Sequence, residues 1–339
     1  MWRTLRHWIT ARGTDAALLA APRLSEKTLG RIGRLLGRLG RAMPILARQV
    51  ADNMRAAGVY SAAEQRAYFD QLGMHFTGAL LALRCSGRKS SPDAAALADV
   101  ADRYVELDRS VADLAAATAP GRGIILIGPH IAGYLLNLAR LNRELPLTVY
   151  LRHSKDAPRR EAKQRWYIAS GVDWISESAN AGGSLGRMGR MADALAAGRV
   201  LFITPDLPQK RDEGTPVRLF GRWAYLPPGP AWLALRTGAP VYLLTARRAG
   251  DRQRLEVQGP FDGASAVRDR GERRAAVAEC MQWFAAGLER FLREQPPLWY
   301  LWGDKRWTRV FRGDAKYAAP LHERIAPPTG ATARAVGAL

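Results

Sequence analysis

The spacing of apolar residues divides the chain into a helical first part and a later part of alternating texture. Residues 24–42 carry apolar side chains at helical spacing with arginines between them, and residues 61–117 are rich in Ala and Leu with interspersed charges. Both patterns are typical of helices that bury one face. The sequence therefore predicts an N-terminal helical region over residues 1–119.

From residue 121 onward, short apolar runs alternate with stretches long enough for helices. The runs predict strands at Ile124–Ile127, Leu147–Leu151, Val172–Ile175, Val200–Thr204, Val217–Phe220, Val241–Thr245 and Arg254–Val257. Helical spacing is found near residues 131–143, 157–170, 184–197, 229–237 and 271–294. This alternation predicts an α/β domain over residues 120–312, with a mostly parallel central sheet flanked by helices. The Pro-, Ala- and Gly-rich residues 313–339 are predicted to be disordered.

The helix predicted over residues 24–42 has an unusual composition. Its apolar positions are Ile32, Leu35, Leu36 and Leu39, and its basic positions are Arg31, Arg34, Arg38 and Arg41. Four glycines, each of which weakens a helix by about 1 kcal/mol relative to Ala, lie among them. Packing or a lipid surface must therefore hold the helix. Two interpretations follow: an element that lies on a membrane surface, or a solvated helix packed on its own domain.

Net charge narrows the class of partner. The 339 residues contain 51 Lys and Arg against 31 Asp and Glu, a net charge of +20. Such a chain favours nucleic acid, an acidic membrane or an acidic carrier protein, but no helix-turn-helix, zinc-finger or RNP aromatic motif supports nucleic-acid binding. The longest N-terminal apolar run, Ala16–Pro22, is too short for a membrane span or a signal-peptide core. A protein that works at a membrane would therefore lie on it.

His130 is the residue that most directly suggests chemistry. The apolar run Ile124–Ile127 meets a Gly-Pro break, then His130, then helical spacing through Leu141. This places an imidazole at the carboxyl end of a buried strand and near a helix start, where α/β proteins carry their sites. Backbone N–H groups there can stabilise a developing oxyanion. The alternative is a histidine that merely ends a strand.

Asp206 ends the strand predicted at Val200–Thr204 in a similar way. A lone acid at the end of a buried strand is costly unless it is used or paired. We therefore expect Asp206 to be functional.

Three separated blocks resemble one known family in their order. They are the strand–Gly-Pro-His130–helix unit; the stretch from Val200 through Asp206 and Gln209 to Phe220-Gly221 and Pro228-Gly229-Pro230-Ala231; and the ending Glu289, Pro296, Trp299 and Trp302. This order resembles the lipid A lauroyl/myristoyl acyltransferases of the lysophospholipid acyltransferase superfamily. Further likeness at Arg48–Asn53 and Tyr150–Arg152 extends the resemblance over about residues 30–310.

The resemblance implies a glycerolipid acyltransferase-like fold and an acyltransferase activity. A fatty acyl chain would move from an acyl-carrier-protein or coenzyme A thioester to a membrane glycolipid or other lipid acceptor similar to lipid A, with His130 as the general base. The protein would be peripheral, or monotopic, on the cytoplasmic face of the bacterial inner membrane. No metal or redox cofactor is implied, and the isolated Cys85 and Cys280 offer neither a zinc motif nor a disulfide framework.

One position departs from the family motif, which is His-x4-Asp/Glu. Five residues after His130 this chain has Leu135 in place of the acid that orients the imidazole. Asn137, seven residues on and so on the same helical face as His130, could accept the imidazole N–H. Alternatively, Asp206 could reach the imidazole from a neighbouring strand end. The third possibility is a protein that has lost catalysis and only binds a lipid or an acyl carrier.

Substrate-binding residues are predicted from charge and from the family motifs. Arg152, Arg165 and Lys210 are candidates for phosphate groups of the acceptor or carrier, because guanidinium and ammonium groups suit phosphate oxygens. Gly229, in the Pro-Gly-Pro-Ala segment, is the fourth candidate. The tryptophans at 299, 302 and 307 could lie at a membrane interface, but core packing is the favoured interpretation.

Overall fold

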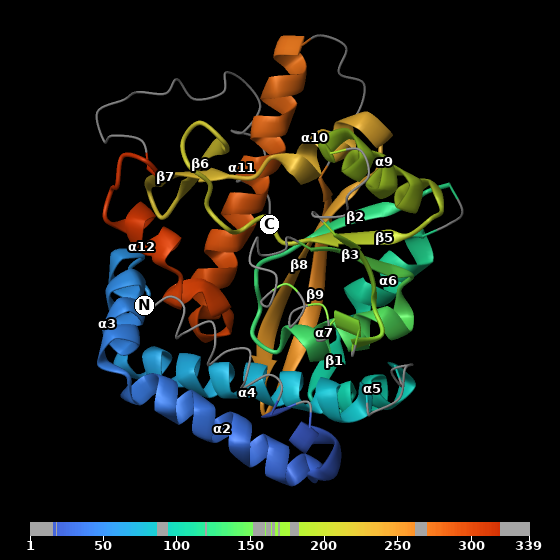
Figure 1. Ribbon diagram of the computed structural model, residues 1–339. Helices are drawn as coiled ribbons and strands as arrows, with labels where there is room; N and C mark the ends of the chain where they lie inside the picture. The colour runs from blue at the N-terminus through green and yellow to red at the C-terminus, as the bar shows by residue number, and fades with distance from the viewer. Residues whose placement is uncertain are drawn as a thin grey trace.

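A seven-stranded sheet with the order β1-β9-β8-β2-β5-β3-β4 forms the centre of the protein (Figure 1). The structure is a computed structural model that describes residues 16–17, 19–86, 94–118, 121–151, 160, 164, 167–168, 170–176, 183–261 and 270–318. The strands of the sheet are β1 (Val105–Leu107), β2 (Ile124–Ile127), β3 (Leu147–Leu151), β4 (Asp173–Ser176), β5 (Val200–Ile203), β8 (Val241–Ala249) and β9 (Arg252–Phe261). Adjacent strands are parallel except for β8 and β9, which are antiparallel. The predicted α/β class with a mostly parallel sheet is confirmed.

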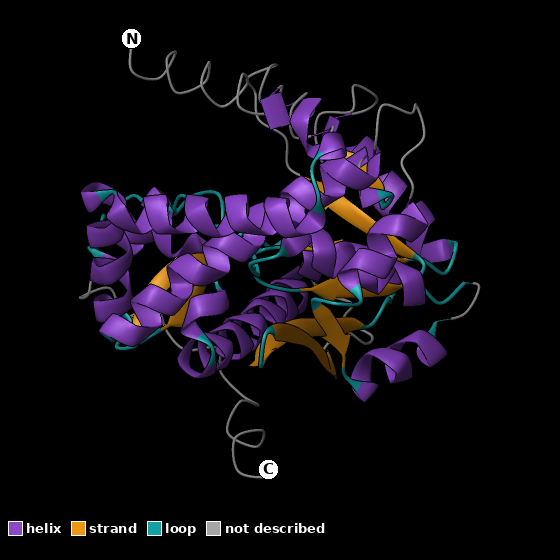
Figure 2. Ribbon diagram, turned by 90° about the horizontal axis from the view of Figure 1, so that it is seen from below, coloured by secondary structure: helices purple, strands orange, loops and turns teal. Residues whose placement is uncertain are grey.

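Helices cover the sheet and form most of the molecule's surface seen from below (Figure 2). They are α2 (Glu26–Ala42), α3 (Pro44–Ala56), α4 (Ala62–Ser86), α5 (Ala94–Ala101), α6 (Arg109–Ala117), α7 (Tyr134–Glu144), α9 (Gly183–Ala196), α10 (Gly229–Thr237), α11 (Arg270–Glu294) and α12 (Lys305–Phe311), with short 3₁₀ turns η1 (Ala21–Arg23), η3 (Pro296–Leu298) and η4 (Tyr300–Gly303). No helix among the described residues is long and apolar enough to cross a membrane.

The central strands are uniformly apolar because both faces of the sheet are covered. Every residue of β2 and of β5 is buried, which agrees with the pattern expected of parallel strands between helical layers. Ile127 of β2 pairs with Ile203 of β5, so the two strands end side by side. The residues that follow them are thereby brought to the same edge of the sheet.

The run predicted at Val217–Phe220 is a strand, but it lies outside the central sheet. Thr215–Leu219 (β6) and Arg222–Leu226 (β7) form a separate two-stranded antiparallel hairpin. Phe220 and Gly221 make its turn with φ values of 51° and 69°, and two-residue hairpin turns of this kind need positive φ at both positions. The Phe220 N–H donates to Glu289 Oε2 at 2.6 Å, so a glutamate from α11 helps to hold this strained turn.

Two other local predictions differ from the structure. The three-residue strand β1 lies before the predicted domain boundary at residues 119–120, yet it pairs with β9 in the central sheet. Three residues are too few for a detectable alternation in the sequence. Of the tail predicted to be disordered, residues 313–318 form a hydrogen-bonded turn in which Ala318 N–H donates to the Asp314 carbonyl; the rest of the tail lies outside the described residues, as does much of the helix predicted at 157–170.

The glycines of α2 form its contact with α4, which runs beside it (Figure 1). A Cβ atom built on Gly33 would lie 2.1 Å from Thr77 Oγ1, and one built on Gly37 would lie 2.4 Å from the carbonyl oxygen of Phe69. Only glycine permits so close an approach. The backbone of α2 therefore packs directly on α4, and the buried Leu29 near the start of the helix adds to this contact with the domain.

The leucines in the second half of α2 face outward. Leu35 is 54% exposed and Leu39 is 52% exposed. They continue along the surface into α3, and together they form what we call the apolar ridge: Leu35, Leu36, Leu39, Met43 and Ile45. The exposed arginines of α2 lie among these residues. The helix is thus packed on its own domain and still presents an apolar face; its position on a membrane surface stays a prediction.

Candidate active site

His130 lies in a loop between strand β2 and helix α7, and hydrogen bonds to residues 298–300 hold that loop in place. Its carbonyl oxygen accepts the Tyr300 N–H at 2.9 Å, and the Ala132 N–H donates to the Leu298 carbonyl oxygen at 2.8 Å. These bonds flank a short antiparallel bridge between Ile131 and Trp299. The loop is therefore fixed by a segment nearly 170 residues later in the sequence.

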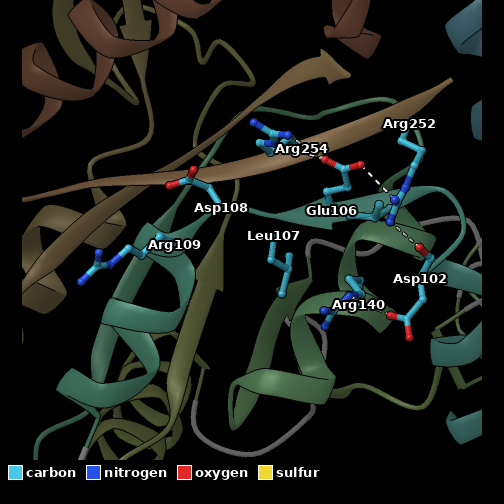
Figure 3. A pocket seen from close by; sticks show the side chains of 9 residues that line it. Asp102, Glu106, Leu107, Asp108, Arg109, Arg140, Arg252 and Arg254 are labelled. Carbon is cyan, nitrogen blue, oxygen red and sulfur yellow. Dashed lines mark hydrogen bonds and ion pairs between the residues drawn. The ribbon is translucent and has the colours of Figure 1, made fainter. Parts of the chain in front are cut away.

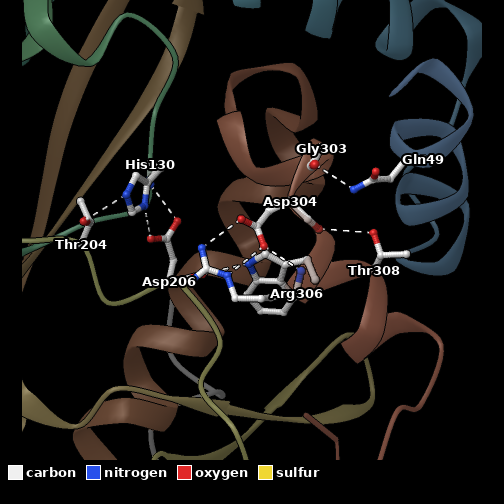
Figure 4. A network of polar contacts seen from close by, with 9 residues as sticks. Gln49, His130, Thr204, Asp206, Gly303, Asp304, Arg306 and Thr308 are labelled. Atoms are coloured by element: carbon white, nitrogen blue, oxygen red, sulfur yellow. Dashed lines mark hydrogen bonds and ion pairs between the residues drawn. The ribbon is translucent and has the colours of Figure 1, made fainter. Parts of the chain in front are cut away.

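Asp206 holds His130 with both of its carboxylate oxygens, one on the imidazole and one on the backbone N–H (Figure 4). The distance from His130 Nδ1 to Asp206 Oδ1 is 2.5 Å, and the His130 backbone N–H donates to Asp206 Oδ2 at 2.8 Å. The aspartate side chain is wholly buried, while the imidazole is 27% exposed. A strand end adjacent to β2 thus supplies the acid that the sequence lacks at position 135.

Two buried tryptophans hold Asp206 in turn. The indole N–H of Trp299 donates to Asp206 Oδ2 at 2.8 Å, and that of Trp307 donates to the Asp206 carbonyl oxygen at 2.9 Å. Trp302 packs edge-on against Trp299, with ring centroids 4.8 Å apart. All three indoles are fully buried, which confirms the predicted core packing. Sequence reasoning missed their second role, although a buried acid requires donors and an indole N–H can only donate.

The second ring nitrogen of His130 faces a threonine. Thr204 Oγ1 lies 3.4 Å from His130 Nε2 at the carboxyl end of β5. A hydrogen bond from Nδ1–H to Asp206 assigns the proton to Nδ1 and leaves a lone pair on Nε2. Nε2 is therefore the atom that can accept a proton from a hydroxyl group. Thr204 was predicted only as part of the strand, and nothing in its sequence context indicates this contact.

The structure directs Asn137 away from His130. Its side-chain N–H groups donate to the Ala132 carbonyl oxygen and to Gln253 Oε1, each at 3.2 Å. The premise that His130 and Asn137 share a helical face is wrong, because α7 begins only at Tyr134, after Gly133 turns the chain with a φ of 77°. Of the two residues proposed to orient the imidazole, only Asp206 is hydrogen-bonded to it. Leu135 is buried in the core.

Two backbone amides of the His130 loop are already used within the protein. The N–H of His130 donates to Asp206, and the N–H of Ala132 donates to Leu298. These two groups therefore cannot serve as the oxyanion donors expected from the sequence. A different donor is required if a tetrahedral intermediate forms beside Nε2.

An aromatic wall lies beside the imidazole. The ring of Tyr134, the first residue of α7, stacks on His130 with centroids 6.4 Å apart and an interplanar angle of 20°. It also contacts Phe202 and Tyr167. Burial raises the pKa of the Tyr134 hydroxyl well above its ordinary value, and the neighbouring Tyr167 adds to this effect. Tyr134 therefore stays neutral and supplies an apolar surface to the site.

The structure describes two of the four predicted substrate-binding residues, Lys210 and Gly229. Arg152 and Arg165 lie outside the described residues. Lys210 is exposed and pairs with Glu213 at 3.4 Å. Gly229 is the exposed first residue of α10. Their assignment to phosphate groups stays a prediction.

A charged pocket of about 410 Å³ lies at the β1 edge of the sheet (Figure 3). Its arginines are paired within the protein: Arg252 and Arg254 with Glu106 at 2.9 and 3.0 Å, and Arg140 with Asp102 at 2.8 Å. None of the residues that contact His130 line it. We interpret it as an ion-pair network at the sheet edge.

The fold and the His130–Asp206 pair define a class of protein. It is an α/β protein in which an imidazole, oriented by a buried carboxylate at the carboxyl ends of parallel strands, can accept a proton from a hydroxyl group. Sequence comparison then gives the family. Residues 3–309 match the family model for bacterial lipid A biosynthesis acyltransferases, so the chain belongs to this family. The resemblance indicated by the three sequence blocks is confirmed, and membership supports a lipid acyltransferase activity.

Comparison with individual proteins adds little to this assignment. No curated protein sequence matches the chain. Among solved structures, the 1-acyl-sn-glycerophosphate (LPA) acyltransferase PlsC from Thermotoga maritima is similar, with 12% sequence identity over 78% of this chain and 99% of that chain and a TM-score of 0.32.

Proposed function

We propose that this protein transfers a fatty acyl chain from an acyl-carrier-protein or coenzyme A thioester to a lipid A-like glycolipid or another membrane lipid, with His130 as the general base. The observation that carries the proposal is the contact between His130 Nδ1 and the buried carboxylate of Asp206. It supplies an orienting acid despite Leu135, whose presence in place of the motif acid was the reason to consider a binding-only protein.

The proposed step is a direct acyl transfer. The acceptor oxygen attacks the thioester carbonyl carbon as His130 Nε2 takes the hydroxyl proton, and a C–O bond forms. The C–S bond then breaks, and the leaving thiolate recovers the proton from the imidazolium as a free thiol. Asp206 keeps the ring in the tautomer that this needs and stabilises the imidazolium. Base catalysis of this kind contributes about 10²–10⁴-fold.

The acceptor hydroxyl would occupy the position beside Nε2 that Thr204 Oγ1 approaches in the free protein. A contact of 3.4 Å is long for a hydrogen bond, so the acceptor loses little by displacing it. In the same proposal Arg152, Arg165, Lys210 and Gly229 bind the phosphate groups of the acceptor or the donor.

We further propose a peripheral position on the cytoplasmic face of the bacterial inner membrane. The apolar ridge and the arginines of α2 support this, because an exposed apolar stripe flanked by basic residues suits an anionic bilayer surface. The ridge would enter the boundary between headgroups and acyl chains, while the arginines pair with lipid phosphates.

Lipid mass spectrometry of cells with and without the gene tests the function. We expect one lipid class to be heavier by one acyl group when the protein is present. We expect this mass shift to disappear when the His130→Ala variant replaces the protein. A folded His130→Ala protein that restores the shift would remove the general-base assignment. An unchanged lipid profile, together with no thiol release by the purified protein from either thioester, would favour a protein that only binds.

A further inference from the structure

A second histidine lies near the His130 site and has no hydrogen-bond partner among the residues that the structure describes. His75 belongs to helix α4 and stacks on Tyr300, with ring centroids 4.5 Å apart and an interplanar angle of 29°. Tyr300 is the residue whose N–H donates to the His130 carbonyl oxygen. The same face of α4 carries Tyr68, whose hydroxyl donates to the Tyr300 carbonyl oxygen at 3.2 Å. Helix α4 thus packs on the segment that clamps the His130 loop.

The two ring nitrogens of His75 are unequal. Nδ1 is covered by protein and has no hydrogen-bond partner among the described residues, although the residue as a whole is only partly buried. A buried polar atom without a partner costs about 1–3 kcal/mol, and such atoms are rare in native proteins. This cost is difficult to explain by packing alone, since a phenylalanine would stack on Tyr300 without it.

His75 is neutral under the conditions in which His130 works. Burial lowers the pKa of His75 to about 4, and the proximity of His130 adds to this effect. A neutral imidazole carries one N–H and one lone pair. With the lone pair on the covered Nδ1, the N–H stands on Nε2. A neutral imidazole can polarise a carbonyl group without placing a second positive charge beside the imidazolium of a catalytic partner.

The geometry points to His75 as a second catalytic residue, whose Nε2–H donates to the carbonyl oxygen of the acyl thioester while His130 takes the proton of the acceptor hydroxyl. This inference rests on the proposed acyl transfer. It supplies the oxyanion donor that the amides of His130 and Ala132 cannot provide, because both already donate within the protein. The negative charge on the carbonyl oxygen exists only in the intermediate and is lost when the C–S bond breaks, so the hydrogen bond acts mainly on turnover.

The test compares three substitutions in the full-length protein. His75→Phe keeps a ring on Tyr300 and removes the donor, His75→Gln places an amide N–H near the position of Nε2, and His75→Asn is too short to do so. Thiol release from myristoyl-coenzyme A is measured with a lipid extract of the producing cells as acceptor. We expect His75→Phe to lower kcat by about 10²–10³-fold, the effect of removing one oxyanion donor, with KM nearly unchanged. His75→Gln should retain at least tenfold more activity than His75→Asn, by about 1.4 kcal/mol of barrier.

Each outcome decides the inference. Near-normal kcat in a folded His75→Phe protein overturns it and leaves the acyl transfer in place. If His75→Phe does not fold, equal activities of the Gln and Asn variants overturn it instead. A change confined to KM assigns His75 to ground-state binding, which also overturns the oxyanion role. If the unaltered protein releases no thiol with myristoyl-coenzyme A or a myristoyl acyl carrier protein, the proposed function fails and this inference fails with it.

Discussion

At the scale of single residues, the role of Asp206 requires a carboxylate and not merely a side chain of the same shape. It accepts three N–H groups, from the His130 imidazole, the His130 backbone and the Trp299 indole. An asparagine in its place has only one acceptor oxygen, and its amide N–H₂ would meet one of these donors. The three bonds cannot all survive the loss of one carboxylate oxygen.

Asp206→Asn is therefore expected to lower turnover by about 10²–10⁴-fold, because an amide that donates to Nδ1 moves the ring proton to Nε2, the atom that must act as base. Thiol release and thermal unfolding should be measured together. Asp173→Asn is the matched control, since Asp173 is 72% exposed and forms only a surface ion pair with Arg199. Turnover of Asp206→Asn equal to that of the control would rule out Asp206 as the orienting group.

The lowered pKa of His75 predicts that the free energy of unfolding depends on pH. Its pKa is about 4 in the folded protein, against 6.5 for an ordinary histidine. Between these values the unfolded chain binds a proton that the folded protein does not, so the free energy of unfolding falls as the pH is lowered through this window. The slope from one such group is at most about 1.4 kcal/mol per pH unit. Urea unfolding between about pH 4 and pH 7 should show a shallower decline in His75→Phe than in the unaltered protein; equal slopes would mean that His75 titrates normally.

At the scale of elements, the contact of α2 with α4 is made by backbone rather than by side chains. Gly33 and Gly37 lie against Gly73 and the α4 backbone. The helix therefore loses propensity at its glycines but gains close packing, and Leu35, Leu36 and Leu39 remain exposed. Composition alone does not distinguish such a helix from an unstable one.

Two alanine substitutions in α2 should have opposite effects on stability. A Cβ at Gly37 would overlap backbone atoms of Phe69 and Gly73, so Gly37→Ala is expected to destabilise the protein by about 1–3 kcal/mol. A Cβ at Gly30 would meet only the end of the Arg34 side chain at 3.5 Å, so Gly30→Ala should stabilise by up to about 1 kcal/mol through helix propensity. Urea unfolding of both variants measures this. Equal effects of the same sign would show that the helices do not pack this closely.

At the scale of the whole molecule, a net charge of +20 coexists with an exposed apolar stripe. The charge acts at a distance and is screened by salt, whereas the stripe acts only on contact. Attachment to a bilayer would therefore have a salt-sensitive and a salt-resistant component. The two components can be separated by substitutions on one helix.

Binding to anionic vesicles should reveal both components. Reversal of charge at Arg31, Arg34, Arg38 and Arg41 is expected to weaken binding at low salt, by about 1 kcal/mol for each lost arginine contact. The double substitution Leu35→Ser with Leu39→Ser should weaken binding at high salt by about tenfold or more, because two apolar side chains that the bilayer would bury are lost. Ile168→Ser is the control, since Ile168 is exposed but outside the apolar ridge. Vesicle sedimentation gives the result, and equal binding of the leucine variant and the control at high salt would exclude the ridge.

The sequence by itself determined the class of fold, the family and the position of His130. Strands covered on both faces must be apolar throughout, so Ile124–Ile127 and Val200–Ile203 are visible as uninterrupted runs, and the residues that follow them must lie at the carboxyl edge of the sheet. Periodicity records that a residue is buried, but it does not record what the residue contacts.

Only the tertiary structure decided which partners those residues have. The acid beside His130 is 76 residues away in sequence, and the indole that holds this acid is another 93 residues away. Strand order brings β5 next to β2, and the bridge between Ile131 and Trp299 brings in the end of the chain. In the same way, packing decided that α2 turns its glycines inward and Leu35, Leu36 and Leu39 outward. Such contacts depend on the register and crossing of elements distant in sequence, which no local pattern of apolar and polar residues specifies.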